Sequence, residues 1–221
     1  MNKFGESRVR LSDITKLVTV LMGPNGSGKS MSLKELDTEI SKHYGDNPSH
    51  FARFGSIYHI EDIKVPIFMY TTSHNDIVDT SMDFNPEHIA AAFTSEGERM
   101  CTSFNHWLGA VWVQNLKKYK PKEYWMLLDE LDSGLSLDRL LITILDFASV
   151  IELEKKRGAN IHIVLTCNSY EFLQALQEYF KDDLDIIWVP SKKKIEVNSY
   201  NDFRKLYLPR FNFYKKQREE Y

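Results

Sequence analysis

The feature that most constrains how this chain can fold is a run of eight residues, 23–30, with the sequence G-P-N-G-S-G-K-S. An apolar run, 17–22, comes directly before it, and the residues after it are apolar at helical spacing. Glycines permit positive φ angles and a close approach of the backbone, so successive N–H groups can turn inward around an anion. The N-terminus of a helix adds positive potential there. The pattern predicts a strand, a phosphate-binding loop and a helix.

The complete pattern G-x-x-x-x-G-K-S assigns roles to individual residues. We expect Lys29 to reach the β and γ phosphates of a nucleotide and the Ser30 hydroxyl to bind Mg²⁺. The residues expected to contact the nucleotide in and beside the loop are Gly23, Asn25, Gly26, Ser27, Gly28, Lys29, Ser30 and Met31. The stretch is therefore interpreted as a nucleotide-binding loop.

A second apolar run, 124–128, is followed directly by two carboxylates, Asp129 and Glu130. The run predicts a buried strand, and open α/β sheets bind their ligands at the carboxyl ends of strands. Asp129 is expected to hold Mg²⁺, directly or through water, beside Ser30. Glu130 is expected to orient or deprotonate the water that attacks the γ-phosphate. An apolar run ending in Asp-Glu is common by itself, but it is expected downstream of a complete phosphate loop.

The remaining residues alternate between predicted strands and helices, which favours an α/β fold. Val9 and Leu11 alternate in a way that predicts a strand or hairpin before the loop. Asn168 follows a predicted strand, where its side chain would point toward the γ-phosphate. The predicted strands are 57–60, 65–70, 161–166, 185–189 and 195–197, and the predicted helices are 30–43, 104–119, 140–157, 170–180 and one that opens at Pro86.

Composition limits the other classes of function. The net charge of −3 gives no overall basic field, so any nucleic-acid contact would be local. The tail, 203–221, mixes aromatic and basic residues, and we interpret it as an amphipathic closing segment in preference to a nucleic-acid contact. Cys101 and Cys167 are interpreted as buried small residues. With no apolar run of about 18 residues, we expect a cytoplasmic protein without a membrane segment.

A weaker motif, S-E-G-E at residues 95–98, precedes a predicted helix. The hydroxyl of Ser95 and the free backbone N–H groups near Gly97 could bind an anion there. An ordinary helix cap explains the same residues.

Taken in order, these motifs resemble those of ABC-type ATPase domains, specifically the soluble heads related to SMC and RecF-like DNA-repair proteins. The resemblance covers roughly residues 8–190. Residues 23–30 match that family's loop letter for letter, 128–130 match its second motif, and 133–136 resemble its D-loop. Residues 95–98 resemble its signature motif, and Asn168 falls at its switch histidine.

The resemblance implies a P-loop NTPase domain over residues 1–221, with a mixed sheet flanked by helices and a small inserted lobe at about 44–120. It implies Mg²⁺-dependent ATP binding and hydrolysis. It also implies an ATP-bound homodimer, head to tail, in which Ser95 and Gly97 of each copy meet the γ-phosphate in the other's loop. DNA or a client protein would be the partner acted on, as in DNA repair.

Departures from the family pattern keep other functions open. Asn168 cannot accept a proton as histidine does, and Ser136 replaces the D-loop aspartate. No glutamine lies between Ser30 and Gln114, and His74 or Asn75 are possible substitutes for the family's Q-loop residue. The alternatives are a slowly hydrolysing or non-hydrolysing nucleotide-gated binding module and, less favoured, a transporter ATPase subunit. For the adenine face, Phe4 and Arg8 are candidates alongside an ordinary strand role.

Overall fold

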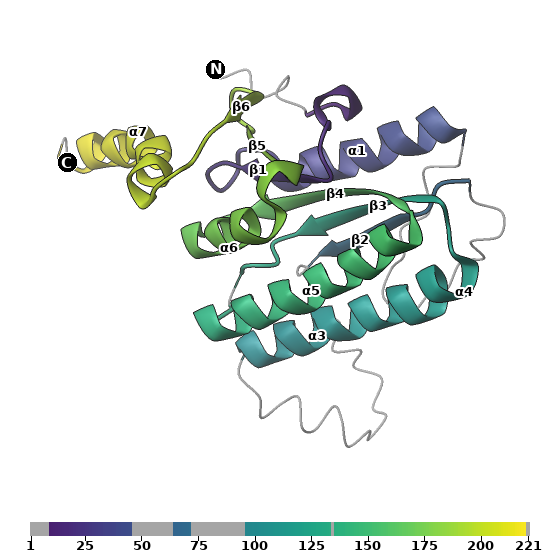
Figure 1. Cartoon of the computed structure of the whole chain (residues 1–221). Helices are drawn as coiled ribbons and strands as arrows, with labels where there is room; N and C mark the ends of the chain where they lie inside the picture. Colours follow the sequence, from purple (N-terminus) through teal and green to yellow (C-terminus); the bar gives the residue numbers. More distant parts are fainter. Residues whose placement is uncertain (1–8, 46–63, 72–95, 134, 220–221) are drawn as a thin grey trace, which may run out of the picture.

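The computed structural model describes residues 9–45, 64–71, 96–133 and 135–219 (Figure 1). Within these residues a central sheet is covered by helices on both of its faces. Several predictions fall on residues outside the described part of the chain: Phe4, Arg8, the strand at 57–60, His74, Asn75, the helix at Pro86, and Ser95.

The sheet has six strands in the order β2-β3-β4-β1-β5-β6. Their bounds are β1 Val18–Met22, β2 Ile67–Thr71, β3 Glu123–Asp129, β4 Asn160–Cys167, β5 Leu184–Trp188 and β6 Lys193–Ile195. Neighbouring strands are parallel, except that β6 runs antiparallel to β5. Strand β4 thus separates β1, which leads into the glycine-rich loop, from β3, which ends at Asp129.

The helices divide between the two faces of this sheet. Helix α1 covers one face, and α3 and α5 cover the other side by side (Figure 1). Their bounds are α1 Lys29–Tyr44, α3 Glu96–Ala110, α4 Lys117–Tyr119, α5 Leu137–Arg157, α6 Tyr170–Phe180 and α7 Tyr200–Glu219, with a π-helical segment Val111–Leu116 between α3 and α4. The predicted α/β class is confirmed by this architecture.

The central strands are apolar on both sides because both sides are covered. Leu21, Leu127 and Val164 belong to the core beneath α1. Val20 and Met126, each one residue away along its strand, belong to the core on the α3 and α5 side. This alternation follows from the two-residue period of a strand, and it holds the strand ends in a fixed register.

A strand predicted before the glycine-rich loop is a turn in the structure. Residues Leu11–Asp13 form a short 3₁₀ turn rather than a strand, because the Asp13 carboxylate accepts the backbone N–H of Arg10 at 2.8 Å and closes the turn. Two described segments of the predicted inserted lobe, 44–120, contact the rest of the fold. Strand β2 pairs with β3 in the central sheet, and α3 packs against α5. Only 46–63 and 72–95 of that range lie outside the described residues.

Cys101 and Cys167 are buried and free, as predicted. Across the described ranges, none of the helices is both long enough and apolar enough to cross a membrane.

Candidate functional site

Strand register brings the predicted motifs to one edge of the sheet. Met22, the last residue of β1, pairs with Cys167 on β4, and Leu128 on β3 pairs with Leu165 on β4. Gly23 and Asn168, which follow β1 and β4, and Asp129, which ends β3, therefore lie side by side at the carboxyl ends. This is the edge at which open α/β sheets bind ligands.

The loop after β1 depends on its glycines for two different reasons. Gly26 and Gly28 have φ angles of 79° and 94°, in the left-handed region that disfavours other residues. Gly23 is confined by packing, because a Cβ there would lie 2.5 Å from Ser27 Oγ and 3.1 Å from Pro190 Cδ. Helix α1 begins at Lys29, directly after Gly28. The predicted order of strand, glycine-rich loop and helix is present.

Lys29 is buried inside this loop. Its ammonium donates hydrogen bonds to the backbone carbonyls of Gly23, at 2.7 Å, and Pro24, at 3.4 Å. Burial lowers the pKa of Lys29, and the nearby carboxylates of Glu130, Asp129 and Asp132 oppose that shift. An ammonium has three donors and no acceptor, so a buried lysine held by two carbonyls retains capacity for an anionic oxygen. The donor set of the loop fits a phosphate group.

Thr166 on β4 contacts both Asp129, the last residue of β3, and Glu130, the residue that follows it. Its hydroxyl donates to Asp129 Oδ1 at 2.9 Å and accepts the backbone N–H of Glu130 at 2.8 Å. Glu130 has a φ angle of 57°, an uncommon value for a residue with a side chain. Asp129 is buried and Glu130 is half-buried, so the strained turn carries the second carboxylate away from the core toward the surface.

Asp132 is a site residue that the sequence motifs did not identify. Its Oδ2 accepts the backbone N–H groups of Asn168 and Ser169 at 2.6 and 2.7 Å. Burial raises the pKa of Asp132, and these two N–H groups oppose the shift. Ser169 caps α6 by accepting the N–H of Phe172 at 3.2 Å. Asp132 therefore ties the turn after β3 to the turn after β4, and its only sequence signal is its place two residues after Glu130.

The oxygen-bearing side chains at this edge suit a Mg²⁺ ion that has one or two protein ligands. They do not suit a metal ion that is coordinated by protein side chains alone. Searching only the described residues gives no group of three or more His, Cys, Asp or Glu side chains suited to a metal ion. In nucleotide sites Mg²⁺ typically takes one or two protein groups and completes its shell with water and phosphate oxygens. Ser30, in the first turn of α1, and Asp129 are the two oxygen-bearing residues that could hold such an ion.

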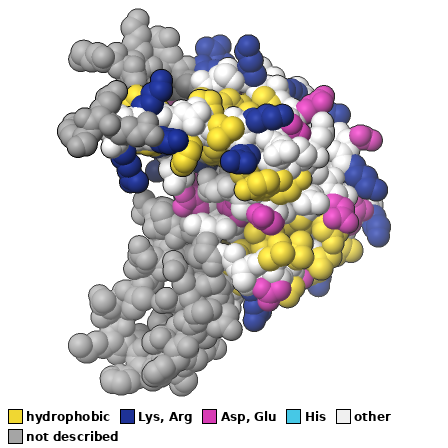
Figure 2. Space-filling model, turned by 90° about the vertical axis from the view of Figure 1, so that its left-hand side faces the viewer, with side chains coloured by type: hydrophobic (Ala, Val, Ile, Leu, Met, Phe, Trp, Pro, Cys, Tyr) yellow, Lys and Arg dark blue, Asp and Glu magenta, His cyan; other side chains and the backbone are white. Residues whose placement is uncertain are grey.

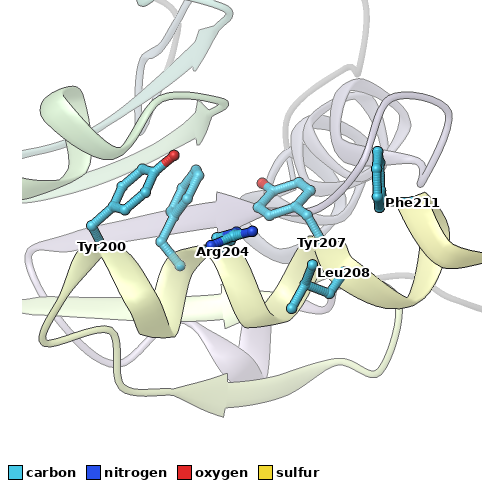
Figure 3. Close-up of a pocket in the computed structure, with 6 residues that line it drawn as sticks. Tyr200, Arg204, Tyr207, Leu208 and Phe211 are labelled. Atoms are coloured by element: carbon cyan, nitrogen blue, oxygen red, sulfur yellow. The ribbon is translucent and has the colours of Figure 1, made fainter.

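Helix α7 reaches the same loop from the far end of the chain. The guanidinium of Arg210 donates a hydrogen bond to the backbone carbonyl of Asn25. The ring of Tyr207 packs edge to face on Trp188, the last residue of β5, with ring centroids 5.3 Å apart. One side of α7 lines a groove of about 290 Å³ (Figure 3). The sequence of this segment shows its aromatic and basic character, but no sequence pattern connects it with the loop.

Charge is unevenly distributed on the face where the strands end. Figure 2 views the molecule from this side, and lysine and arginine side chains gather in its upper part while acidic ones cross its middle. The acidic residues Asp129, Glu130 and Asp132 and the buried Lys29 account for the charge inside the site itself. Both signs needed for a cation and a phosphate are therefore present at this edge.

The predicted site residues fall into three groups. Residues 23–30, Asp129, Glu130 and Asn168 are brought together at the strand ends. Met31 is 57% exposed on α1, beyond the loop. Gly97 lies in the first turn of α3 rather than before the helix, because α3 already begins at Glu96, and α3 covers the sheet face opposite α1. Its partner in the motif, Ser95, is outside the described residues.

The sequence matches no protein-family model, and comparison with curated proteins gives no match. The resemblance to ABC-type ATPases consequently depends on the motifs alone, and the functional argument depends on the geometry of this edge.

Proposed function

We propose that this chain is a Mg²⁺-dependent ATPase of the P-loop class, with the glycine-rich loop as its phosphate site. The observation that carries the proposal is the burial of the Lys29 ammonium inside that loop, held by the Gly23 and Pro24 carbonyls and facing the carboxylates after β3. A buried lysine at this position is costly unless an anion is its normal partner. A triphosphate is the anion that the complete loop pattern predicts.

Each residue of the site has a distinct task in this proposal. The loop N–H groups and Lys29 bind the phosphate oxygens. Glu130 orients a water and accepts its proton as the water oxygen bonds to the γ-phosphorus, and the bond from that phosphorus to the bridging β-γ oxygen breaks to give ADP and phosphate. Ser30 and Asp129 would hold Mg²⁺, which neutralises charge on the β and γ phosphates.

The position of β4 supports this division of labour. Because β4 lies between β1 and β3, Thr166 on β4 and Asn168 directly after it come from the strand between those that lead to the loop and to the carboxylates. Thr166 holds Asp129 and the backbone of Glu130 in a fixed relation, which a positioned water requires. Asn168 can donate a hydrogen bond to a phosphate oxygen or to the water.

The resemblance to ABC-type heads extends the proposal to an ATP-bound, head-to-tail homodimer. Ser95 and Gly97 of one copy would meet the γ-phosphate bound by the other copy. DNA or a protein client is the proposed partner of that dimer. The proposed dimer is based on the motif at 95–98, which would contact a nucleotide only in a second copy of the chain.

The experiment compares wild-type protein, Glu130→Gln and Glu178→Gln, a matched change at an exposed position on α6. Turnover of Mg-ATP is measured as phosphate release, and mass is measured by light scattering after size exclusion. We expect Glu130→Gln to lower turnover by roughly 10²-fold or more while retaining ATP, since a general base typically contributes that much. Its mass should double with Mg-ATP, and Glu178→Gln should match wild type.

Equal turnover in wild type and Glu130→Gln would remove Glu130 from the reaction. A mass that stays monomeric with ATP bound would contradict the dimer and leave the binding site intact.

A second candidate is a nucleotide-gated binding module that hydrolyses slowly or not at all. Asn168 favours it, because the residue at the end of β4 has a side chain that cannot accept a proton during turnover. ATP binding by wild-type protein without measurable phosphate release would support this candidate over the ATPase.

A further inference from the structure

Helix α7 is anchored beside the phosphate loop by aromatic packing. Tyr170 on α6 contacts Tyr200 and Phe203 edge to face, at centroid separations of 5.6 and 5.8 Å. Tyr207 packs on Trp188, the last residue of β5. Trp188 in turn pairs with Met22, the last residue of β1. These contacts fix the first half of α7 on the edge where the strands end, with Tyr207 and Phe211 on the side shown in Figure 3.

Tyr207 lies close to the loop and within electrostatic range of the turn after β3. The Gly23 backbone lies beside the Tyr207 hydroxyl, and Asp132 and Cys167 are close enough to act on it electrostatically. Cys167 ends β4, and Asp132 belongs to the turn after β3. The Tyr207 side chain of α7 therefore lies near both the start of the loop and the end of β4.

Arg210 is the residue of α7 that contacts the loop directly. It donates to the Asn25 carbonyl, and its guanidinium carbon lies 5.6 Å from the centre of the Tyr214 ring, one turn further along. A second nitrogen donates a longer hydrogen bond, 3.4 Å, to the Tyr214 hydroxyl. Arginine has five N–H donors in a planar fork, so these two bonds leave donors available. Within the described chain, no carboxylate forms a salt bridge with Arg210.

The position of Lys29 relates Arg210 to the expected phosphate site. In the complete loop pattern this lysine reaches the β and γ phosphates. Its ammonium sits at the carbonyls of Gly23 and Pro24, and the next carbonyl along the chain, that of Asn25, is the one that Arg210 occupies. The two cations thus bind consecutive carbonyls of the same loop.

We propose that Arg210 binds the terminal phosphate of the bound nucleotide, releasing the Asn25 carbonyl as it does so. This proposal rests on the proposed function, because it needs a triphosphate in the loop. A guanidinium binds phosphate oxygens in pairs and is always charged, which suits the charge that develops on a γ-phosphate during transfer. Arginines that act on a transferring phosphoryl group raise turnover by roughly 10³- to 10⁵-fold.

The test measures ATP and ADP affinity separately for wild type, Arg210→Ala, Arg210→Lys and the control Arg204→Ala. Arg204 is on the same helix and lines the groove, but no hydrogen bond or salt bridge joins it to another described residue. Calorimetry with Mg²⁺ gives both affinities without requiring turnover. Phosphate release is followed in parallel.

We expect Arg210→Ala to weaken ATP binding by roughly tenfold and to leave ADP binding unchanged, so the ratio of the two affinities falls. Turnover should fall by roughly 10²-fold or more, Arg210→Lys should recover part of it, and Arg204→Ala should match wild type. An unchanged ratio and unchanged turnover in Arg210→Ala would overturn the proposal. Equal losses of ATP and ADP binding would also overturn it, because they would make Arg210 a structural tether of the loop.

Failure of the proposed function gives a different result. In that case wild-type protein itself would bind neither nucleotide, whereas failure of the Arg210 proposal alone would leave wild-type binding and its dependence on Lys29 intact.

Discussion

The glycine-rich loop, residues 23–30, has two neighbours that are built in different ways. On one side, the turns after β3 and β4 are joined by buried hydrogen bonds through Thr166 and Asp132. On the other side, α7 is held by aromatic packing and reaches the loop through one exposed arginine. The first flank is fixed by groups that cannot move without leaving a buried charge unpaired. On the second flank, Arg210 is exposed, so exchanging its carbonyl partner for another costs little free energy.

This difference suggests separate roles for the two flanks. A rigid set of carboxylates suits the positioning of a metal and a water, since catalytic groups must be held to within fractions of an ångström. An exposed arginine suits a contact that forms only when a ligand arrives. The following predictions test how far the flanks differ.

The largest effect is expected from Thr166→Val on the buried flank. The substitution keeps the shape of the side chain but leaves Asp129 Oδ1 and the Glu130 N–H without their partner, which should lower the free energy of unfolding by about 2–4 kcal/mol. Turnover should fall more than ATP affinity, because the carboxylates lose their fixed geometry. Urea denaturation and phosphate release measure the two effects.

Thr143→Val is the matched control for this change. Thr143 is a buried threonine on α5 whose hydroxyl has only a 3.6 Å contact with the Cys101 sulfur. Thr143→Val should lower the free energy of unfolding by less than Thr166→Val does, and it should leave turnover unaltered. An equal loss of unfolding free energy at the two positions would show that the hydrogen bonds of Thr166 stabilise the protein no more than the Thr143 contact does.

The smallest effect is expected from Tyr207→Phe on the α7 flank. The Tyr207 hydroxyl is buried and has no hydrogen-bond partner among the described residues, and burial raises the pKa of this phenol. Removing such a group should leave the free energy of unfolding unchanged or raise it by up to about 1 kcal/mol. A loss of stability in the same urea assay would mean that the hydroxyl bonds to the loop and that this flank is as firmly held as the other.

The sequence predicts the buried flank better because its parts are local. The apolar runs that form β1, β3 and β4 are each followed directly by the residues they deliver to the site, so Lys29, Asp129, Glu130 and Asn168 could be named without a structure. Helix α6 has the bounds that the sequence predicts, 170–180, and in the structure Ser169 caps it.

The sequence could not predict contacts that depend on the packing of distant segments. Arg210 meets Asn25 across 185 residues of chain, and Asp132 acts through backbone N–H groups that carry no side-chain pattern. The same limit applies to β2. Its apolar run was predicted as a strand, but its pairing with β3 in the main sheet, instead of in a separate lobe, depends on tertiary contacts.

The central claim is that the buried Lys29 binds a nucleotide phosphate, and calorimetric titration of the full chain with Mg-ATP tests it most directly. Wild type is compared with Lys29→Ala and with Lys34→Ala, a matched change at an exposed position on the same helix. The account predicts binding by wild type and Lys34→Ala and a loss of roughly 100-fold or more in Lys29→Ala, since a buried charge-assisted contact is removed. Equal ATP affinity in wild type and Lys29→Ala would contradict it.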